Sequence, residues 1–526
     1  MEPDEGEWWN PLLRFAVHLV VAVMSTAPLA WRMGDRLPLG AEPVATVPLF
    51  NLWSLRWTAQ ELPAGWNGWW DAPIFWPTTG AYARSELQPL TGLAYGALRW
   101  LTNDTAAYGV LLIAALALTG LAASAVARQL GVAAVPAVLA GILAQTIPFL
   151  FDQLGVLQLL MVWPVLLAVN SLLAWAQTPS LRRAAAFGCW LSVSYLTCGY
   201  HAALFVMATV LATPCLVRRT WLGEWRCRSC GVALAAGVFA ACAIPFAFGQ
   251  SSRLGDARWA DATIAAGSAS WQELWPGSAW YGGTLVVLAT VGGVTARGRR
   301  AVLFLAVLGV AAFGLALGTR LSILGWHPYA MLVEQLGFVA RLRSPFRATA
   351  LGQLVLVLLS SLALDRVWRT RVRLQRGAVV GVVVAVLLTA ELGSGRLAAM
   401  PPTDLVWIQW LAEHPGGAVV LMPMAPGSRV EDFEATTEGM VQALEHGHPL
   451  VNGYTGFFPS GHRGQRQRLE GFPDASSVAE LRALGVEYVV ADALWWNSRR
   501  AVAAVTQGLT IVLAGPDGVL IRVAQP

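Results

Sequence analysis

The sequence predicts a polytopic α-helical membrane protein of about eleven spans, followed by a C-terminal α/β domain outside the cytoplasm. Three observations support this class. The 526-residue chain is 56% hydrophobic and only 13% charged, whereas soluble proteins average roughly 25% charged residues. Apolar runs of about 17 to 22 residues recur along it, long enough to cross a hydrocarbon core of roughly 30 Å. After residue 395 these runs stop and a soluble pattern begins.

The first apolar run, from Phe15 to Trp31, follows an acidic leader. A signal peptide needs a positively charged leader, so we interpret this run as the first span. The spans are expected at residues 14–31, 107–127, 131–150, 156–176, 184–199, 201–217, 231–248, 281–296, 301–318, 346–364 and 377–394. The fifth and sixth are short for two full crossings and break at Gly199.

Arginine placement predicts the orientation of the chain. With the N-terminus in the cytoplasm, every inner connection carries arginine, as short cytoplasmic loops should. All basic residues are arginine and the net charge is only +5, which we interpret as a topology signal rather than affinity for nucleic acid. The predicted domains are a transmembrane domain at residues 1–394, with a large first outer loop at 32–106, and an outer domain at 395–526.

The outer domain is predicted from alternating helix and strand patterns. Residues 404–417 indicate a helix ending in glycine, 418–424 a buried strand, 477–485 a second helix and 486–492 a second strand. Residues 509–524, with Pro-Asp-Gly at their centre, indicate a hairpin. This alternation is typical of a small α/β domain.

The first outer loop is long and rich in tryptophan. Loops beyond about 15 residues without obvious elements are usually functional or disordered, and its aromatic content argues against disorder. Indole rings settle at the lipid headgroup level, so we expect interfacial helices lying on the membrane. The tryptophans are Trp53, Trp57, Trp66, Trp69, Trp70, Trp76 and Trp100.

Four acids of this loop are candidate catalytic residues: Asp35, Glu42, Asp71 and Glu86. A carboxylate held near a low-dielectric surface can accept a proton from an attacking hydroxyl or help to hold a cation. Each could instead be a solvated loop charge or a helix cap. Asp71 and Glu86 are favoured because apolar residues and prolines surround them.

Arg341, Arg343 and Arg347 precede the tenth span in "FVARLRSPFRATA". A guanidinium can hold a phosphate through its planar fork, or extend to anionic lipid headgroups. These arginines fall outside, against the usual charge rule, and a proline stiffens the segment. Both features favour phosphate binding.

Few ionisable residues lie within the predicted spans: His18, His201, Asp365 and Glu391. Such residues are functional candidates by default. His201, at the break between the fifth and sixth spans, could line an outward cavity, whereas Asp365 and Glu391 lie near span ends and are expected at the interface. The spans carry no ladder of charges of the kind a proton-driven transporter uses.

Several phrases of the sequence resemble a known group. They are "PLFNLWSLRW", "WWDAPIFWPTTGAYARSELQPLTG", "LGVLQLLMVWPVLL", "ARLRSPFRATAL", "HPLVNGYTGFFPS" and "LRALGVEYVV". The chain resembles the large bacterial multi-span membrane proteins of the class C glycosyltransferase (GT-C) fold. The resemblance implies an inner-membrane enzyme that transfers a sugar from a polyprenyl-phosphate carrier to a glycan, lipid or protein acceptor of the cell envelope, on the outer face of the membrane.

The resemblance also implies roles for residues. The general base is sought among Asp35, Glu42, Asp71 and Glu86, and Arg343 and Arg347, with Arg341 beside them, are the candidates for the lipid phosphate. Relatives place an aspartate just before the "LFNLW" phrase, where this chain has Pro48, so the identity of the base stays open. The expected partners are membrane lipids, the polyprenyl-phosphate sugar as donor substrate and the acceptor. A divalent cation is possible.

Two other functions remain alternatives. A lipid or polysaccharide transporter or flippase predicts internal repeats or broken, charged helices, and no clear repeat is present. A non-catalytic envelope scaffold is the second alternative. The stretch "HGHPLVNGYTGFFPSGHRG" could contact a polysaccharide or could be a loop packed onto the membrane part.

Overall fold

A computed structural model gives the structure of most of the chain. It describes residues 11–217, 224–275, 277, 279–296, 299–370, 372–388, 392–393, 395–499 and 508–524.

The chain divides into two compact units. The helical unit consists of Met1–Met33, Gly109–Phe248 and Asp256–Arg396. The mixed unit consists of Gly34–Tyr108, Gly249–Gly255 and Leu397–Pro526. Most of the predicted first loop therefore shares a unit with the predicted outer domain. The last segment of the mixed unit begins at Leu397, close to the boundary expected at residue 394. The predicted division into two domains stays a prediction.

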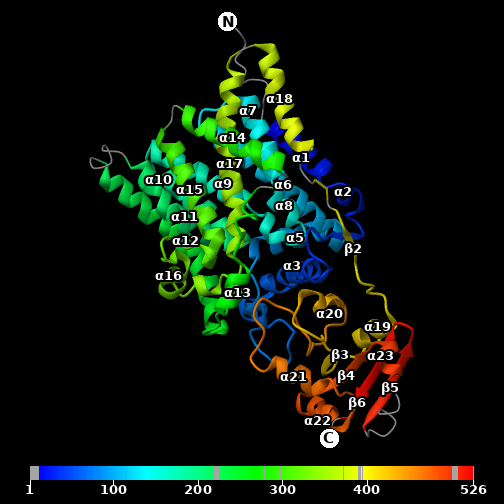
Figure 1. The fold of residues 1–526 in the computed structure, drawn as a ribbon. Coiled ribbons are helices and arrows are strands. Elements are labelled where there is room, and N and C mark those ends of the chain that lie inside the picture. The colour runs from blue at the N-terminus through cyan, green and yellow to red at the C-terminus, as the bar shows by residue number, and fades with distance from the viewer. Residues whose placement is uncertain are drawn as a thin grey trace. The chain divides into compact units, whose positions relative to one another are not determined.

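Each of the eleven predicted spans falls mainly on a helix of the structure (Figure 1). These helices are α1 (Pro11–Ser25), α6 (Asp104–Gln129), α7 (Ala134–Gln145), α9 (Trp163–Gln177), α10 (Leu181–Thr197), α11 (Gly199–Ala212), α12 (Trp225–Leu254), α14 (Ala279–Thr295), α15 (Arg299–Leu317), α17 (Thr349–Trp368) and α18 (Arg373–Leu388). Shorter pieces connect them: α2 (Leu29–Arg32), α8 (Pro148–Asp152), η2 (Leu157–Leu160), η3 (Thr213–Leu216), α13 (Asp261–Ala266), η5 (Gly318–Arg320), α16 (Pro328–Gln335), η6 (Val339–Arg341) and η7 (Pro345–Ala348).

Seven helical stretches among the described residues are long and apolar enough to cross a membrane. They are Asp104–Gln129, Ala134–Asp152, Leu157–Gln177, Gly199–Leu216, Trp225–Leu254, Arg300–Arg320 and Pro345–Trp368. Shorter apolar helices lie at Pro11–Ser25, Tyr281–Thr295 and Leu374–Ala385. The predicted class, a polytopic helical membrane protein, is confirmed. The number of about eleven spans stays a prediction.

Helix α17 is the packing centre of the helical unit. It is the most buried of the candidate spans, with 83% of its apolar window inside the protein, and it packs against α14, α15 and α7 (Figure 1). Close approach to α14 depends on Gly292, where an added Cβ would lie 2.0 Å from the backbone oxygen of Leu359. Small residues at helix contacts serve this purpose in membranes.

The ionisable residues expected within spans have local partners. The Nε2 atom of His18 lies 3.0 Å from the hydroxyl of Ser124. A carboxylate oxygen of Asp365 accepts a hydrogen bond from the N–H of Ala133 at 2.7 Å, and the other pairs with Arg369 at 2.6 Å. These contacts give His18 and Asp365 structural roles. Glu391 lies outside the described residues.

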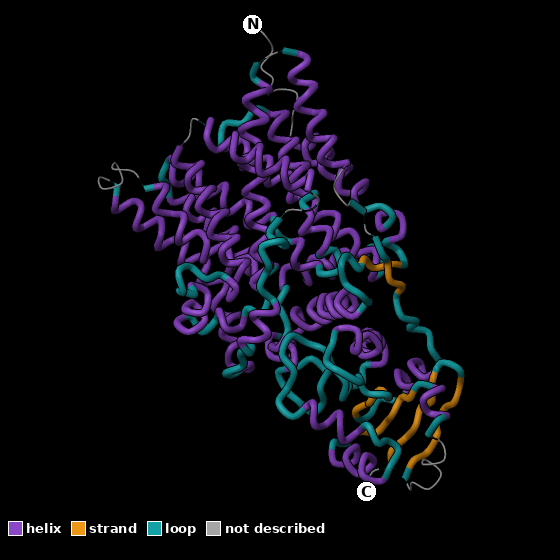
Figure 2. The backbone as a smooth tube through the Cα atoms, viewed as in Figure 1, coloured by secondary structure: helices purple, strands orange, loops and turns teal. Residues whose placement is uncertain are grey.

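The C-terminal part of the mixed unit is the predicted α/β domain (Figure 2). Its sheet has the strand order β3-β4-β6-β5, with β3 and β4 parallel and the other pairs antiparallel. The strands are β3 (Ala418–Met422), β4 (Val486–Ala491), β5 (Leu509–Gly515) and β6 (Gly518–Val523). The helices are α19 (Val406–Glu413), η8 (Val430–Phe433), α20 (Glu434–His446), α21 (His462–Leu469), α22 (Ala475–Ala483) and α23 (Ala493–Asn497). The predicted helices, strands and hairpin all form.

The first-loop part of the mixed unit is well ordered. It contains β1 (Arg36–Pro38), α3 (Thr46–Ala64), α4 (Trp66–Trp70), η1 (Ala81–Arg84) and α5 (Pro89–Arg99). Strand β1 pairs antiparallel with β2 (Leu397–Ala399), the first strand after the last helix of the helical unit.

The expectation that the loop's tryptophans settle among lipid headgroups is wrong for four of them. Trp53, Trp57, Trp69 and Trp70 are 0–9% exposed. Trp53 stacks on Trp57, and Trp69 packs on Trp70. Burying a large ring against other rings removes more apolar area from water than an interface does, so these residues form a core. Trp66, Trp76 and Trp100 are exposed, Trp100 at 92%.

A cluster of charges joins α3 to α20 and to the start of α6. The guanidinium of Arg56, 5% exposed, contacts Glu445 at 2.5 Å and Asp104 at 3.3 Å. Asp104 also pairs with Arg99 at 2.5 Å and accepts a hydrogen bond from Tyr95. At the start of α3, a carboxylate oxygen of Glu434 accepts a hydrogen bond from the N–H of Ala45 at 2.8 Å. The two ends of α20 are thus held to the start and the middle of α3.

We expect Arg56→Met to lower the free energy of unfolding of the mixed unit by roughly 1.5–3 kcal/mol, the usual value of a hydrogen bond to a charged group, because Glu445 loses its buried cation while Asp104 keeps Arg99. Arg99→Met is the matched control: its side chain is 37% exposed, and an exposed ion pair contributes only about 0–1 kcal/mol. Chemical unfolding followed by tryptophan fluorescence measures both. Equal losses in the two variants would contradict a special role for the buried charge.

Candidate functional site

Asp71 and Glu86 lie at the two ends of one loop of the mixed unit, here called the acid loop (residues 71–86). Asp71 follows the last residue of α4 and is exposed. One of its carboxylate oxygens accepts a hydrogen bond from the N–H of Gly80 at 2.7 Å. Gly80 adopts a left-handed conformation, φ +65°, which glycine tolerates without steric cost. The carboxylate of Asp71 therefore closes a turn and is itself fixed in place by that turn.

The middle of the acid loop forms backbone hydrogen bonds with the C-terminal domain. The N–H of Leu450 donates to the oxygen of Pro73 at 2.9 Å, and the N–H of Trp76 donates back to the oxygen of Leu450 at 2.8 Å. The N–H of Phe75 donates to the oxygen of Asn452 at 3.2 Å. Residues 73–76 thus pair with residues 450–452, which a loop lying alone on a membrane would not do.

Phe75 is held in an unfavourable backbone conformation. Its φ is +58°, which is rare for a bulky residue and costs of order 1–3 kcal/mol. Its ring is 2% exposed and packs edge-on against Phe458 and His462. Gly453 is part of this packing, since an added Cβ would lie 2.8 Å from the ring. The aromatic contacts compensate for the strained backbone.

Glu86 is half-buried and follows η1. The turn η1 is anchored to α3 by Tyr82, whose hydroxyl lies 2.6 Å from that of Ser54 and 2.8 Å from that of Thr58. Burial raises the pKa of Tyr82, so its hydroxyl stays protonated. The backbone just ahead of Glu86 is therefore fixed onto the core of the mixed unit.

The other two candidate acids lie elsewhere in the same unit. Asp35 is exposed and pairs with the adjacent Arg36 at 3.2 Å, beside β1. Glu42 is half-buried in a turn ahead of α3, and its N–H donates to the oxygen of Leu39 at 3.0 Å. The structure thus places Asp71 and Glu86 on one loop and separates Asp35 and Glu42 from that loop along the chain. Which acid acts as a base stays a prediction.

The candidate arginines belong to the helical unit, and two of them, Arg343 and Arg347, contact Tyr200. The guanidinium of Arg347, a buried residue of η7, lies over the ring of Tyr200 at 4.1 Å. The N–H of Arg343 donates to the hydroxyl of Tyr200 at 3.1 Å, and its guanidinium lies over Trp259 at 5.3 Å. Arg341 ends η6 and is half-buried. Aromatic faces hold cations in this way.

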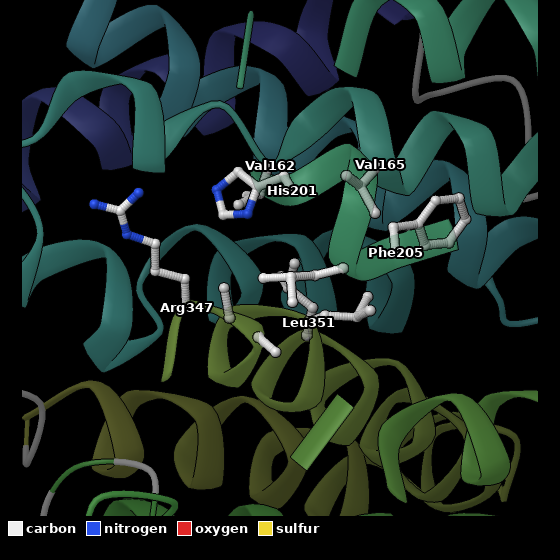
Figure 3. Close-up of a pocket in the computed structure, with 10 residues that line it drawn as sticks. Val162, Val165, His201, Phe205, Arg347 and Leu351 are labelled. Carbon is white, nitrogen blue, oxygen red and sulfur yellow. The ribbon is translucent and has the colours of Figure 1, made fainter. Parts of the chain in front are cut away.

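A small pocket of the helical unit brings Arg347 and His201 together (Figure 3). In the view of Figure 3, Arg347 lies at one end of the lining residues and Phe205 at the other, with His201 and Leu351 between them. The Nε2 atom of His201 is 3.0 Å from the oxygen of Leu159. The remaining walls are apolar: Val162, Val165, Leu204, Ala348, Ala350 and Leu354. His201 is thus one of the residues that line this pocket, and the outward cavity expected from the sequence stays a prediction.

Tyr200 and Trp259 are residues that sequence reasoning missed. Tyr200 lies between Gly199, where the fifth and sixth predicted spans break, and His201, so the break indicates this position as well. Nothing in the sequence links Tyr200 to Arg343 and Arg347, which lie more than 140 positions away.

The stretch around residues 446–462 is a packing element in the structure. Asn452, Tyr454 and His462 are 2–9% exposed, and Tyr454 packs edge-on against Phe50 of α3. These side chains pack against the first-loop part of the mixed unit, and contact of the stretch with a polysaccharide stays a prediction.

The described residues contain no group of three or more His, Cys, Asp or Glu side chains that could hold a metal ion. The possible divalent cation stays a proposal.

Comparison with solved structures shows the class of fold. A crystal structure of ArnT from Cupriavidus metallidurans bound to undecaprenyl phosphate matches with a TM-score of 0.53 at 16% identity, over 98% of this chain and 99% of that chain. The apo state of ArnT gives 0.51 at 17% identity, over 98% of each chain. The arabinofuranosyltransferase AftD from mycobacteria gives 0.63 at 16% identity, over 98% of this chain and 42% of that chain.

These likenesses confirm the predicted class C glycosyltransferase fold. No model of a protein family matches the sequence, and no curated protein matches it.

The packing of His462 predicts a pH dependence of stability. Burial, reinforced by the charge of Arg466, lowers the pKa of His462 to about 4, whereas a histidine in the unfolded chain titrates near 6.5. Between these values the unfolded state binds a proton that the folded state does not, so stability falls as pH falls. We expect His462→Gln to flatten this slope by up to about 1.4 kcal/mol per pH unit.

Unfolding midpoints at several values between pH 6.5 and pH 4 measure the slope. His414→Gln is the control, because His414 is exposed and stacked on Trp410. An unchanged slope in His462→Gln would contradict the burial of a neutral ring.

Proposed function

We propose that the protein is a membrane glycosyltransferase that moves a sugar from a polyprenyl-phosphate carrier to a cell-envelope acceptor on the outer face of the bacterial inner membrane. The observation that carries the proposal is the placement of Arg343 and Arg347 on aromatic rings, beside a small pocket with apolar walls that His201 also lines. A polyprenyl phosphate has the matching chemistry, an anion joined to a hydrocarbon chain. The fold supports the proposal, since ArnT of the same fold was crystallised with undecaprenyl phosphate.

In the proposed reaction an acceptor hydroxyl attacks the anomeric carbon of the sugar. The bond from that carbon to the phosphate oxygen breaks, the hydroxyl proton passes to a carboxylate, and the polyprenyl phosphate leaves with its negative charge. Phosphate is already a good leaving group, so the protein needs to orient the acceptor, accept one proton and stabilise one anion.

Asp71 and Glu86 are the favoured bases, because the acid loop is held by backbone hydrogen bonds and positions its carboxylates before any substrate binds. Arg347 and Arg343 are the proposed phosphate ligands. A ring contact holds a guanidinium without cancelling its charge. A divalent cation is not required by this chemistry, and where one is used it would add positive charge at the phosphate.

Removal of the base should abolish sugar transfer. We expect either Asp71→Asn or Glu86→Gln to lower kcat by roughly 10²- to 10⁴-fold, the usual contribution of a positioned general base. Purified protein in lipid is incubated with a panel of polyprenyl-phosphate sugars, and release of labelled sugar is measured. Glu413→Gln, an exposed acid of α19, is the control.

Two outcomes would count against the assignment. Full activity in both variants would exclude Asp71 and Glu86 as the base and leave Asp35 and Glu42. Absence of turnover by the folded wild type with every donor would favour a transporter or an envelope scaffold.

The phosphate role of Arg347 predicts a binding defect. We expect Arg347→Met to weaken binding of undecaprenyl phosphate by about 10- to 100-fold, because a charge-assisted hydrogen bond is worth roughly 1.5–3 kcal/mol. Arg366→Met, an exposed arginine of α17, should bind like the wild type. Affinity for the uncharged polyprenol serves as a second control and should not change. Equal affinity of Arg347→Met and wild type for the phosphate would refute this role.

A further inference from the structure

The last turn of α12 contacts the acid loop beside Glu86. The side-chain amide of Gln250 donates two hydrogen bonds, to the oxygen of Ala83 at 3.0 Å and to that of Ser85 at 2.9 Å. The carbonyl between them, that of Arg84, accepts from the N–H of Phe457 at 3.1 Å. Three consecutive carbonyls at the end of η1 therefore accept hydrogen bonds, two from Gln250 of α12 and one from the C-terminal domain.

The same turn of α12 contacts the other end of the acid loop. The guanidinium of Arg253 lies over the ring of Trp70 at 5.1 Å, directly before Asp71. The stem of Arg253 packs on Gly80, where an added Cβ would lie 3.3 Å from it, and Gly80 is the residue whose N–H holds Asp71. Gly249 lets the helix approach, since a Cβ there would lie 2.6 Å from Trp70.

We propose that residues 249–253 of α12 fix Asp71 and Glu86 relative to each other, and that Gln250 is the positioning residue for Glu86. This inference rests on the proposed function for its catalytic meaning. Gln250 contacts the carbonyl of Ser85, which belongs to the peptide that joins Ser85 to Glu86. The placement of this peptide decides where the Glu86 carboxylate points.

Glutamine suits this role for a physical reason. The carbonyls of Ala83 and Ser85 lie at the end of a 3₁₀ turn, where backbone acceptors have no partner within the helix. A primary amide offers two donors on one nitrogen, so a single side chain satisfies both. Glutamate has nearly the same shape but offers no donor when ionised, and its charge would repel both carbonyls.

Three variants test the proposal. Gln250→Met keeps the length of the side chain and removes both donors, and Gln250→Glu keeps its shape. Gln442→Met is the matched control, because Gln442 also lies in the mixed unit and its amide donates to a backbone oxygen, that of Pro402 at 3.0 Å, away from the acid loop. For each we measure kcat and KM for sugar release, and amide hydrogen exchange of residues 81–88.

We expect both Gln250 variants to lower kcat by about 10- to 100-fold with KM within about twofold, since a small displacement of a catalytic group has effects of this size. Exchange in residues 81–88 should become faster, and Gln442→Met should match the wild type in both measurements. A purely structural role predicts faster exchange with unchanged kcat, and that result would overturn the proposal, as would unchanged exchange.

If one Gln250 variant does not fold, the other decides between these outcomes. If the folded wild type releases no sugar from any donor, the proposed function fails. The exchange measurement then still decides by itself whether Gln250 fixes the backbone ahead of Glu86.

Discussion

The mixed unit depends on residues 450–452, whose backbone is bonded on both sides. On one side Val451 donates to the oxygen of Val419 in β3 at 2.9 Å, and on the other Leu450 and Asn452 pair with the acid loop. A buried backbone must satisfy its donors and acceptors, so this short stretch joins the C-terminal sheet to a loop more than 370 residues earlier in the chain. The position of Phe75 follows from this pairing, and the two ends of the acid loop are held in addition by the contacts of α12.

Charge and aromatic packing strengthen the same connection. The carboxylates of Glu434 and Glu445 contact the start and the middle of α3, one at the N–H of Ala45 and the other at the guanidinium of Arg56. The rings of Phe50, Phe75, Tyr454 and Phe458 fill the space between the first-loop and C-terminal parts. These contacts hold the acid loop against the C-terminal domain and so limit the positions that its carboxylates can take.

The helical unit holds positively charged side chains in largely apolar surroundings. Arg343 and Arg347 contact aromatic rings, so their charge is stabilised by the ring faces. The adjacent pocket combines Arg347 and His201 with aliphatic side chains.

The sequence by itself determined the membrane class, the helices on which the eleven predicted spans fall, and the helices and strands of the C-terminal domain. These features follow from local composition and from apolar periodicity, which act over about 5 to 20 residues. It also indicated His201 as a cavity residue, from a helix break beside it. The class of fold was apparent from whole phrases of the sequence.

Only the tertiary structure decided the surroundings of the candidate site residues. Residues far apart in the chain come together in three places. Trp53 and Trp70 are buried in one core, Arg347 contacts Tyr200, and Gln250 donates hydrogen bonds to the acid loop. Such contacts leave no periodic signal, because each depends on one side chain reaching one distant partner. For the same reason composition alone predicted that the tryptophans lie at the lipid headgroups, whereas in the structure Trp53, Trp57, Trp69 and Trp70 pack against other rings of the mixed unit.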